Sequence, residues 1–154
     1  MFFRIFLNFL IVFFAESLFA SVYYVSVKGD DSNSGKSWKE PFATISKAIA
    51  ACTSAGGGEV WVAKGTYYPD SSMEMKNGVA VYGGFNGSEA ALSERQIGVE
   101  TIIDGQSKIR IFSNRQLNAS AKIDSLIFEN MIMVTHYQEE LPACITNSLF
   151  LKRN

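Results

Sequence analysis

Cysteine and histidine are scarce in this sequence. Its 154 residues include two cysteines, Cys52 and Cys144, and one histidine. Two cysteines do not make a disulfide framework, although export from the cell permits a single bond between them, and the sequence leaves their pairing open. No Cys-x-x-Cys pair and no second histidine accompany them, which argues against a zinc site.

An excess of positive charge is also missing. The net charge is -1, and the 14 lysines and arginines are scattered along the chain. Non-specific binding of nucleic acid requires clustered basic residues that displace counterions, so we expect no nucleic-acid partner. The sequence contains no P-loop, dinucleotide fingerprint or nucleophile elbow. Its carboxylates fall in different predicted turns, so we predict no catalytic and no cofactor-binding residue.

No apolar run is long enough for a membrane anchor, which needs about 20 residues. Residues 5–14 are apolar except for Asn8, and Glu16 ends the run. A short basic start, an apolar stretch and a small residue at Ala20 are typical of a signal peptide. We therefore predict a signal peptide over residues 1–20, with residues 15–17 as an alternative cleavage site. The mature chain would be exported and would have no stable membrane span.

Hydrophobic residues are abundant, at 47% of the sequence, which excludes a disordered chain. A helical periodicity lies between a start at Pro41 and a stop at Gly56, with Thr44 and Ser46 as alternative caps. Its apolar stripe is Ile45, Ala48, Ile49 and Cys52. Strand-like periodicity precedes and follows this helix at residues 22–27, 59–63, 66–68, 79–82, 101–104 and 123–128, with shorter candidates at 73–76 and 109–112.

The strands after the helix recur about every 20–25 residues, which is a repeat length typical of solenoids. Hairpin sandwiches have turns every 8–12 residues, and doubly wound folds place a helix after each strand. We therefore predict an all-β fold, the start of a right-handed parallel β-helix with one N-terminal capping helix. The cap and first coils would occupy residues 21–130. Inward positions would be Val60, Val79, Val81, Ile103 and Ile127.

The strand pattern is not recognisable beyond Asn130. Residues 131–154 lack glycine turns and regular alternation, so we predict an aperiodic tail and a truncated solenoid. A solenoid that ends without a cap exposes strand edges. We therefore expect self-association through an open C-terminal coil.

Two sets of residues are candidates for binding. Asp30, Asp31 and Asn33 resemble part of a calcium loop, but the later bidentate acid is missing, and turns closed by these side chains are the alternative. The aromatic residues could stack on sugar rings, or pack beneath long loops. They are Trp38, Tyr67, Tyr68 and Tyr82.

Five segments together resemble the N-terminal part of secreted right-handed parallel β-helix proteins of the pectin-lyase-like superfamily, over residues 22–130. They are YYVSVKGDDSNSGKSW, PFATISKAIAAC, GGGEVWVAKGTYY, GVAVYGGFNGSEAALSERQ and TIIDGQ. The resemblance implies an exported bacterial protein, secreted or at the cell surface or outer membrane. The lyases of this superfamily carry their calcium-binding and catalytic residues on later coils. The resemblance therefore assigns no catalytic residue to a position in this chain.

These observations lead to a first hypothesis of a non-catalytic, adhesin-like surface fragment that contacts a polysaccharide or a host cell surface. The alternative is a fragment of a carbohydrate-active enzyme, a pectate-lyase-like polysaccharide lyase. A structural remnant without activity is a third hypothesis.

Overall fold

The computed structural model describes residues 20–110, 117–132, 145–146 and 149–151. The predicted signal peptide and Cys144 lie outside the described residues, except for Ala20, so both remain predictions. Among the residues that are described, no helix has the length and apolar character to cross a membrane.

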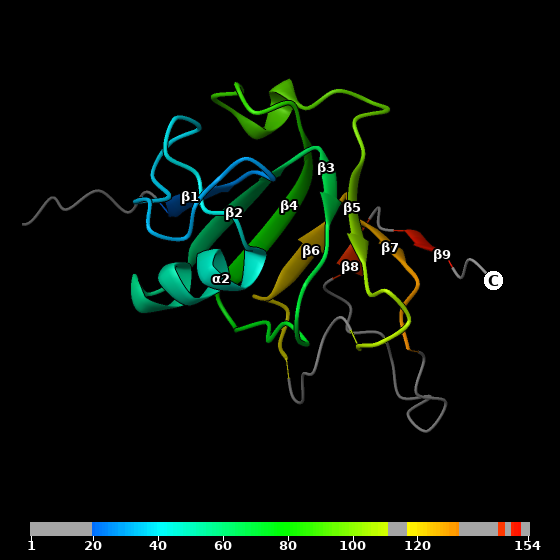
Figure 1. Ribbon diagram of the computed structural model, residues 1–154. Helices are drawn as coiled ribbons and strands as arrows, with labels where there is room; N and C mark the ends of the chain where they lie inside the picture. Colours follow the sequence, from blue (N-terminus) through cyan, green and yellow to red (C-terminus); the bar gives the residue numbers. More distant parts are fainter. Residues whose placement is uncertain (1–19, 111–116, 133–144, 147–148, 152–154) are drawn as a thin grey trace, which may run out of the picture.

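The described strands form two sheets in which every neighbouring pair is parallel (Figure 1). The first sheet has the order β1 (Ser21–Val25), β2 (Gly58–Ala63), β4 (Val79–Phe85), β6 (Lys122–Asp124) and β8 (Ile145–Thr146). The second has the order β3 (Gly65–Tyr67), β5 (Thr101–Asp104), β7 (Ile127–Glu129) and β9 (Leu149–Leu151).

From β2 onward the chain alternates between the two sheets and moves one position along each at every pass. The register places Val60 beside Val81, and Val81 beside Ile123. Parallel neighbours cannot be joined by tight hairpins, so the chain has to leave each sheet before it can add the next strand. The prediction of short parallel strands is confirmed, and the topology is compatible with a parallel β-helix.

Helix α2 (Ile45–Ser54) packs against strands β1, β2 and β4. The predicted start at Pro41 is wrong, and the alternative cap at Thr44 is confirmed, because the Thr44 side chain accepts a hydrogen bond from the Lys47 N–H. The helix ends where the Gly57 N–H bonds the Cys52 carbonyl at 2.9 Å. The predicted stripe of Ile45, Ala48, Ile49 and Cys52 is buried, as expected. Burial raises the pKa of the Cys52 thiol to about 11.

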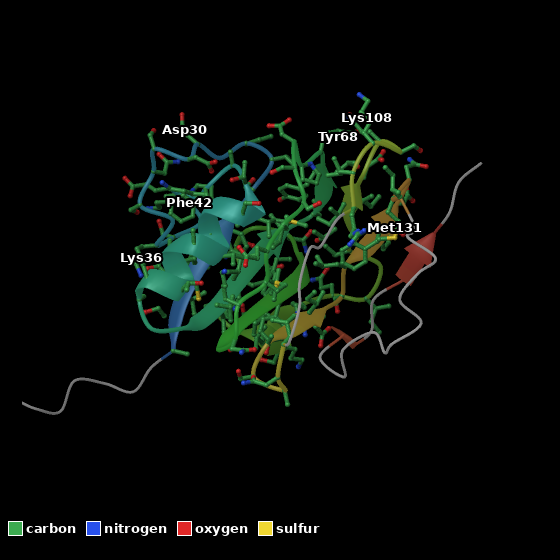
Figure 2. All side chains as sticks on the ribbon, turned by 90° about the horizontal axis from the view of Figure 1, so that it is seen from below. Asp30, Lys36, Phe42, Tyr68, Lys108 and Met131 are labelled. Carbon is green, nitrogen blue, oxygen red and sulfur yellow. The ribbon has the colours of Figure 1, made fainter. Side chains whose placement is uncertain are left out.

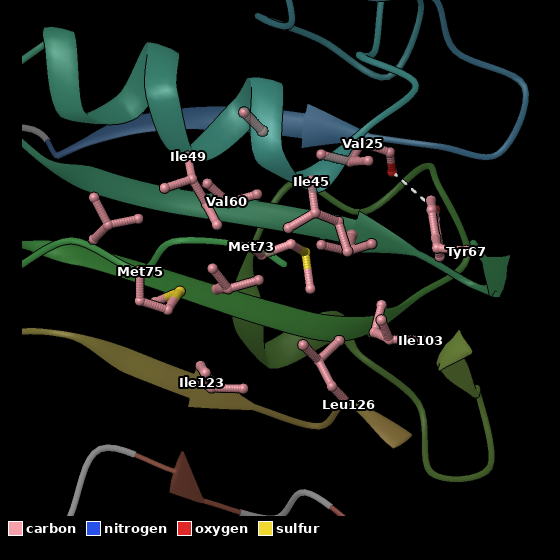
Figure 3. Packing of buried hydrophobic residues seen from close by; sticks show 14 of the residues in the cluster. Val25, Ile45, Ile49, Val60, Tyr67, Met73, Met75, Ile103, Ile123 and Leu126 are labelled. Carbon is pink, nitrogen blue, oxygen red and sulfur yellow. Dashed lines mark hydrogen bonds between the residues drawn. The ribbon is translucent and has the colours of Figure 1, made fainter. Parts of the chain in front are cut away.

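The main core lies between the two sheets and helix α2 (Figure 3). Val60, Val79, Val81 and Ile103 face it, as predicted, and are at most 1% exposed. Met73 and Met75 also point into this core, although the segment predicted as a strand at 73–76 is not one. Alternation of apolar residues thus marks an irregular segment that packs against the core as well as it marks a strand.

The predicted strand at 123–128 is two strands, and Ile127 does not face the core. Ser125 has a positive φ of 57°, so the chain turns there from β6 in one sheet to β7 in the other. The turn shifts the alternation by one residue, because a register step of one reverses every side chain. Leu126 and Phe128 are therefore the buried residues, whereas Ile127 is half-buried.

Other strand boundaries also differ from the predictions. Strand β1 ends at Val25, and Val27 is exposed. Strand β4 continues through Gly83 and Gly84 to Phe85. Residues 109–110 are not in a strand, and the rest of that predicted strand lies outside the described residues.

Most of the predicted aperiodic tail at residues 131–154 lies outside the described residues, but two short strands are described within it. Strand β8 pairs with β6, and β9 pairs with β7, so both sheets gain a further parallel strand. These strands have two and three residues, which is too few for alternation to be recognised in a sequence.

A long connection, residues 86–100, joins β4 to β5 and carries the short helix η2 (Leu92–Glu94). Its Glu89 side chain is buried and accepts hydrogen bonds from the backbone N–H groups of Asn86, Gly87 and Ser88, at 2.6–2.9 Å. Ile97, farther along the connection, is fully exposed. The connection therefore has a fixed base and a protruding part.

Candidate functional site: a pocket beside the first turn of helix α2

A pocket of about 240 Å³ lies between the start of helix α2 and the segment that follows strand β3. This volume is below the roughly 300–1,000 Å³ of sites for drug-sized ligands, so the pocket suits one small ring. It is lined by Ala43, Thr44, Ile45, Ser46, Tyr67, Tyr68, Pro69, Asp70, Ser71, Met73 and Ile103.

The pocket combines buried apolar side chains with a polar rim. Ile45, Met73 and Ile103 are buried members of the main core (Figure 3). The exposed rim residues are Thr44, Ser46, Tyr68, Asp70 and Ser71. Apolar surface together with a few polar groups is the usual composition of a small-molecule site.

Tyr67 and Tyr68 have different environments, because Tyr67 is the last residue of β3 and Tyr68 is the first residue after it. Tyr67 is 7% exposed, and its hydroxyl donates a hydrogen bond of 2.9 Å to the Ala63 carbonyl. Burial raises the pKa of Tyr67 well above its ordinary value. Tyr68, which is labelled in Figure 2, is 57% exposed. Tyr68 therefore has an accessible ring, whereas Tyr67 forms part of the wall.

The other two aromatic candidates pack on the opposite side of the first sheet, away from the main core. Trp38 lies 4.7 Å from Tyr24 between ring centroids, and its Nε1–H donates to the Glu89 carbonyl at 2.8 Å. Tyr82 is 8% exposed and belongs to the same apolar cluster as Trp61 and Phe85. Trp38 and Tyr82 therefore pack beneath a long loop, as the alternative interpretation expects.

Charged side chains lie beside the cluster that contains Tyr82, Trp61 and Phe85. The Arg95 guanidinium lies 5.4 Å from the Tyr82 ring centroid and 3.5 Å from Asp124 Oδ1. Lys122 Nζ lies 3.5 Å from Asp124 Oδ2. Arg95 thus links the connection at residues 86–100 to strands β4 and β6, whereas the contact between Lys122 and Asp124 lies within β6.

The calcium candidates are already engaged within the protein. Asp30 Oδ1 accepts hydrogen bonds from the Ser32 backbone N–H and hydroxyl, at 2.7 and 2.6 Å. These bonds lower the pKa of Asp30. The Asn33 amide donates to the Pro41 carbonyl at 2.8 Å. Asp30 therefore makes the hydrogen bonds of a turn closed by its own side chain.

Asp31 binds the start of helix α2. Its Oδ1 accepts from the backbone N–H groups of Ala43 and Thr44, each at 2.9 Å, and its Oδ2 accepts from the Thr44 hydroxyl at 2.7 Å. Within the described part of the chain, no three acidic, histidine or cysteine side chains are grouped as metal ligands would be.

The sequence alone did not indicate that Asp70 and Ser71 would meet Thr44 and Ser46 at one pocket. The turn residues after Tyr68 were visible, but their position beside the helix depends on the path from β3 back to the core. Which polar residues come together at the pocket therefore depends on the fold and not on any local sequence pattern.

Comparison with known proteins gives one match. Residues 27–133, well over half of the chain, match DUF1565, a family described as proteins of unknown function. Neither the curated proteins nor the solved structures contain a significant match. Because this match covers well over half of the chain, the chain belongs to the DUF1565 family, which is associated with β-helix proteins.

Proposed function

We propose that this chain is a right-handed parallel β-helix module of an exported surface protein, and that its pocket binds a sugar unit of a glycan. Support for the β-helix comes from two parallel sheets that the chain visits in alternation, and from the resemblance to pectin-lyase-like proteins. Support for export comes from the signal-like residues 1–20.

The observation that carries the glycan proposal is the exposed Tyr68 ring at the rim of a small pocket with hydroxyl and carboxylate groups. An aromatic face stacks on the apolar face of a sugar ring, and a few polar groups fix its orientation. Asp70, Ser71, Thr44 and Ser46 supply oxygen atoms that accept from sugar hydroxyls. The hydroxyls of Ser46 and Ser71 can also donate, whereas the Thr44 hydroxyl already donates to Asp31.

Glycan-array binding followed by titration calorimetry tests this proposal. We expect Tyr68→Ala to weaken binding about five- to tenfold, which corresponds to roughly 1–1.4 kcal/mol. Tyr68→Phe keeps the ring and should retain most of the affinity. Val27→Ala, at another exposed apolar residue outside the pocket lining, is the matched control. Unchanged binding by Tyr68→Ala would show that the glycan is held elsewhere.

The alternative function, a fragment of a polysaccharide lyase, predicts turnover. Cleavage of a uronate polymer by elimination creates an unsaturated product that absorbs in the ultraviolet. Product formation by the purified chain, with or without added calcium, would replace the binding proposal. Binding of a glycan without product would support it.

A further inference from the structure

We infer that the pocket selects a neutral sugar unit and discriminates against a uronate, an inference that rests on the glycan-binding function proposed above. The side chains at the pocket and the start of helix α2 set the sign of the local charge. Of the described residues that line the pocket, Asp70 is the one with a charged side chain. It is exposed at the rim, two residues after Tyr68.

The start of helix α2 could have favoured an anion, because a helix N-terminus carries about half a positive charge. Asp31 already occupies that position. Its carboxylate accepts the N–H groups of Ala43 and Thr44 and the Thr44 hydroxyl, all at 2.7–2.9 Å. The Thr44 hydroxyl in turn accepts from the Lys47 N–H at 3.2 Å.

The charges at the pocket and at the start of helix α2 sum to a negative value. One full negative charge on Asp31 exceeds the partial positive charge of the helix end, and Asp70 adds a second negative charge. Lys47, in the first turn of the helix, does not line the pocket, and its Nζ lies 6.0 Å from the centroid of the Phe42 ring. A sugar carboxylate at the rim would therefore be repelled, whereas hydroxyl groups can donate to Asp70.

Titration calorimetry with cellohexaose, mannohexaose and hexagalacturonate tests the inference on the purified chain. We expect a neutral hexaose to bind at least about fivefold more tightly than the uronate at low salt, with a smaller ratio at high salt. Asp70→Asn should weaken neutral binding by about two- to threefold, because an amide oxygen is a weaker acceptor, and should strengthen uronate binding about fivefold.

Glu74→Gln is the matched control, because it removes one negative charge from the same segment outside the pocket lining. It should leave the ratio between neutral and uronate binding unchanged. Uronate binding equal to or tighter than neutral binding in the wild type would overturn the charge inference and leave the glycan function standing. Failure of all three oligosaccharides to bind would count against the proposed function itself. Circular dichroism shows whether Asp70→Asn is still folded. If it is not, the salt dependence of uronate binding by the wild type tests the charge inference.

Discussion

Asp31 is joined to Thr44 by two hydrogen bonds, one to the backbone N–H at 2.9 Å and one to the side-chain hydroxyl at 2.7 Å. Thr44 is the N-cap of helix α2. The loop between β1 and the helix therefore fixes where the helix begins, and through it one wall of the pocket.

Replacement of Asp31 should destabilise the protein more than replacement of its neighbour. We expect Asp31→Ala to lower the free energy of unfolding by about 1–2 kcal/mol, because three donors at the start of the helix lose their acceptor. Asp30→Ala removes bonds to Ser32 within an exposed turn and should change it by less than about 1 kcal/mol. Urea unfolding followed by circular dichroism measures both, and equal losses would contradict this account.

The hydroxyl of Tyr67 should contribute to stability, whereas that of Tyr68 should not. Tyr67→Phe leaves the Ala63 carbonyl without the 2.9 Å hydrogen bond that it accepts in a buried site. The expected loss is about 1 kcal/mol in the free energy of unfolding. Tyr68→Phe, at an exposed ring, is the control and should be neutral within about 0.5 kcal/mol. The comparison fails if thermal melting shifts equally for both variants.

Glu89 should make stability depend on pH. Burial raises the pKa of its carboxyl, but backbone hydrogen bonds from residues 86–89 outweigh this effect, so the pKa lies below its ordinary value of 4.5. A lowered pKa in the folded state means that the stabilisation is complete above the ordinary value and disappears as the pH falls below it.

The variant Glu89→Gln therefore should be less stable than wild type by roughly 1–2 kcal/mol near neutral pH, and the difference should shrink in acid. Glu100→Gln, at an exposed position of the same connection, should show no such convergence. Urea unfolding monitored by tryptophan fluorescence at several pH values measures the difference. A gap that stays constant from neutral to acidic pH would exclude the carboxylate as its cause.

Gly58 should tolerate substitution less well than Gly56. Both have positive φ, but a Cβ at Gly58 would lie 2.2 Å from the Ser21 carbonyl oxygen, whereas one at Gly56 would meet nothing within 4 Å. Gly56→Ala should cost about 1 kcal/mol from backbone strain alone. Gly58→Ala should cost about 3 kcal/mol or more, since strand β1 must move away. Similar melting temperatures for the two variants would show that β1 is not held this closely.

The helix and the approximate positions of most strands could be predicted because their signals are local. The apolar stripe from Ile45 to Cys52 and the glycines after it require no knowledge of distant residues. The turn at Ser125 could not be predicted, because a serine with positive φ has no sequence signature of its own. The expected inward position of Ile127 was wrong for the same reason.

The site was accessible to sequence reasoning only in part. Tyr68 was recognised as an aromatic residue that could stack on sugars, and its exposure agrees with that hypothesis. Asp31 and Asp70 lie in separate loops, and they are linked through Thr44, which bonds Asp31 and lines the same pocket as Asp70. Contacts between segments of this kind leave no periodic pattern.

The connection between β4 and β5 is tied down by Glu89 and Arg95, while Ile97 beyond them is completely solvent-exposed. The pairing of β3 with β5 aligns Gly65 with Thr101 and involves no residue near Ile97. The strands therefore do not depend on the side chains at residues 96–98. A peptide tag inserted at residues 96–98 should therefore leave the strand pairing unchanged and remain accessible to an antibody.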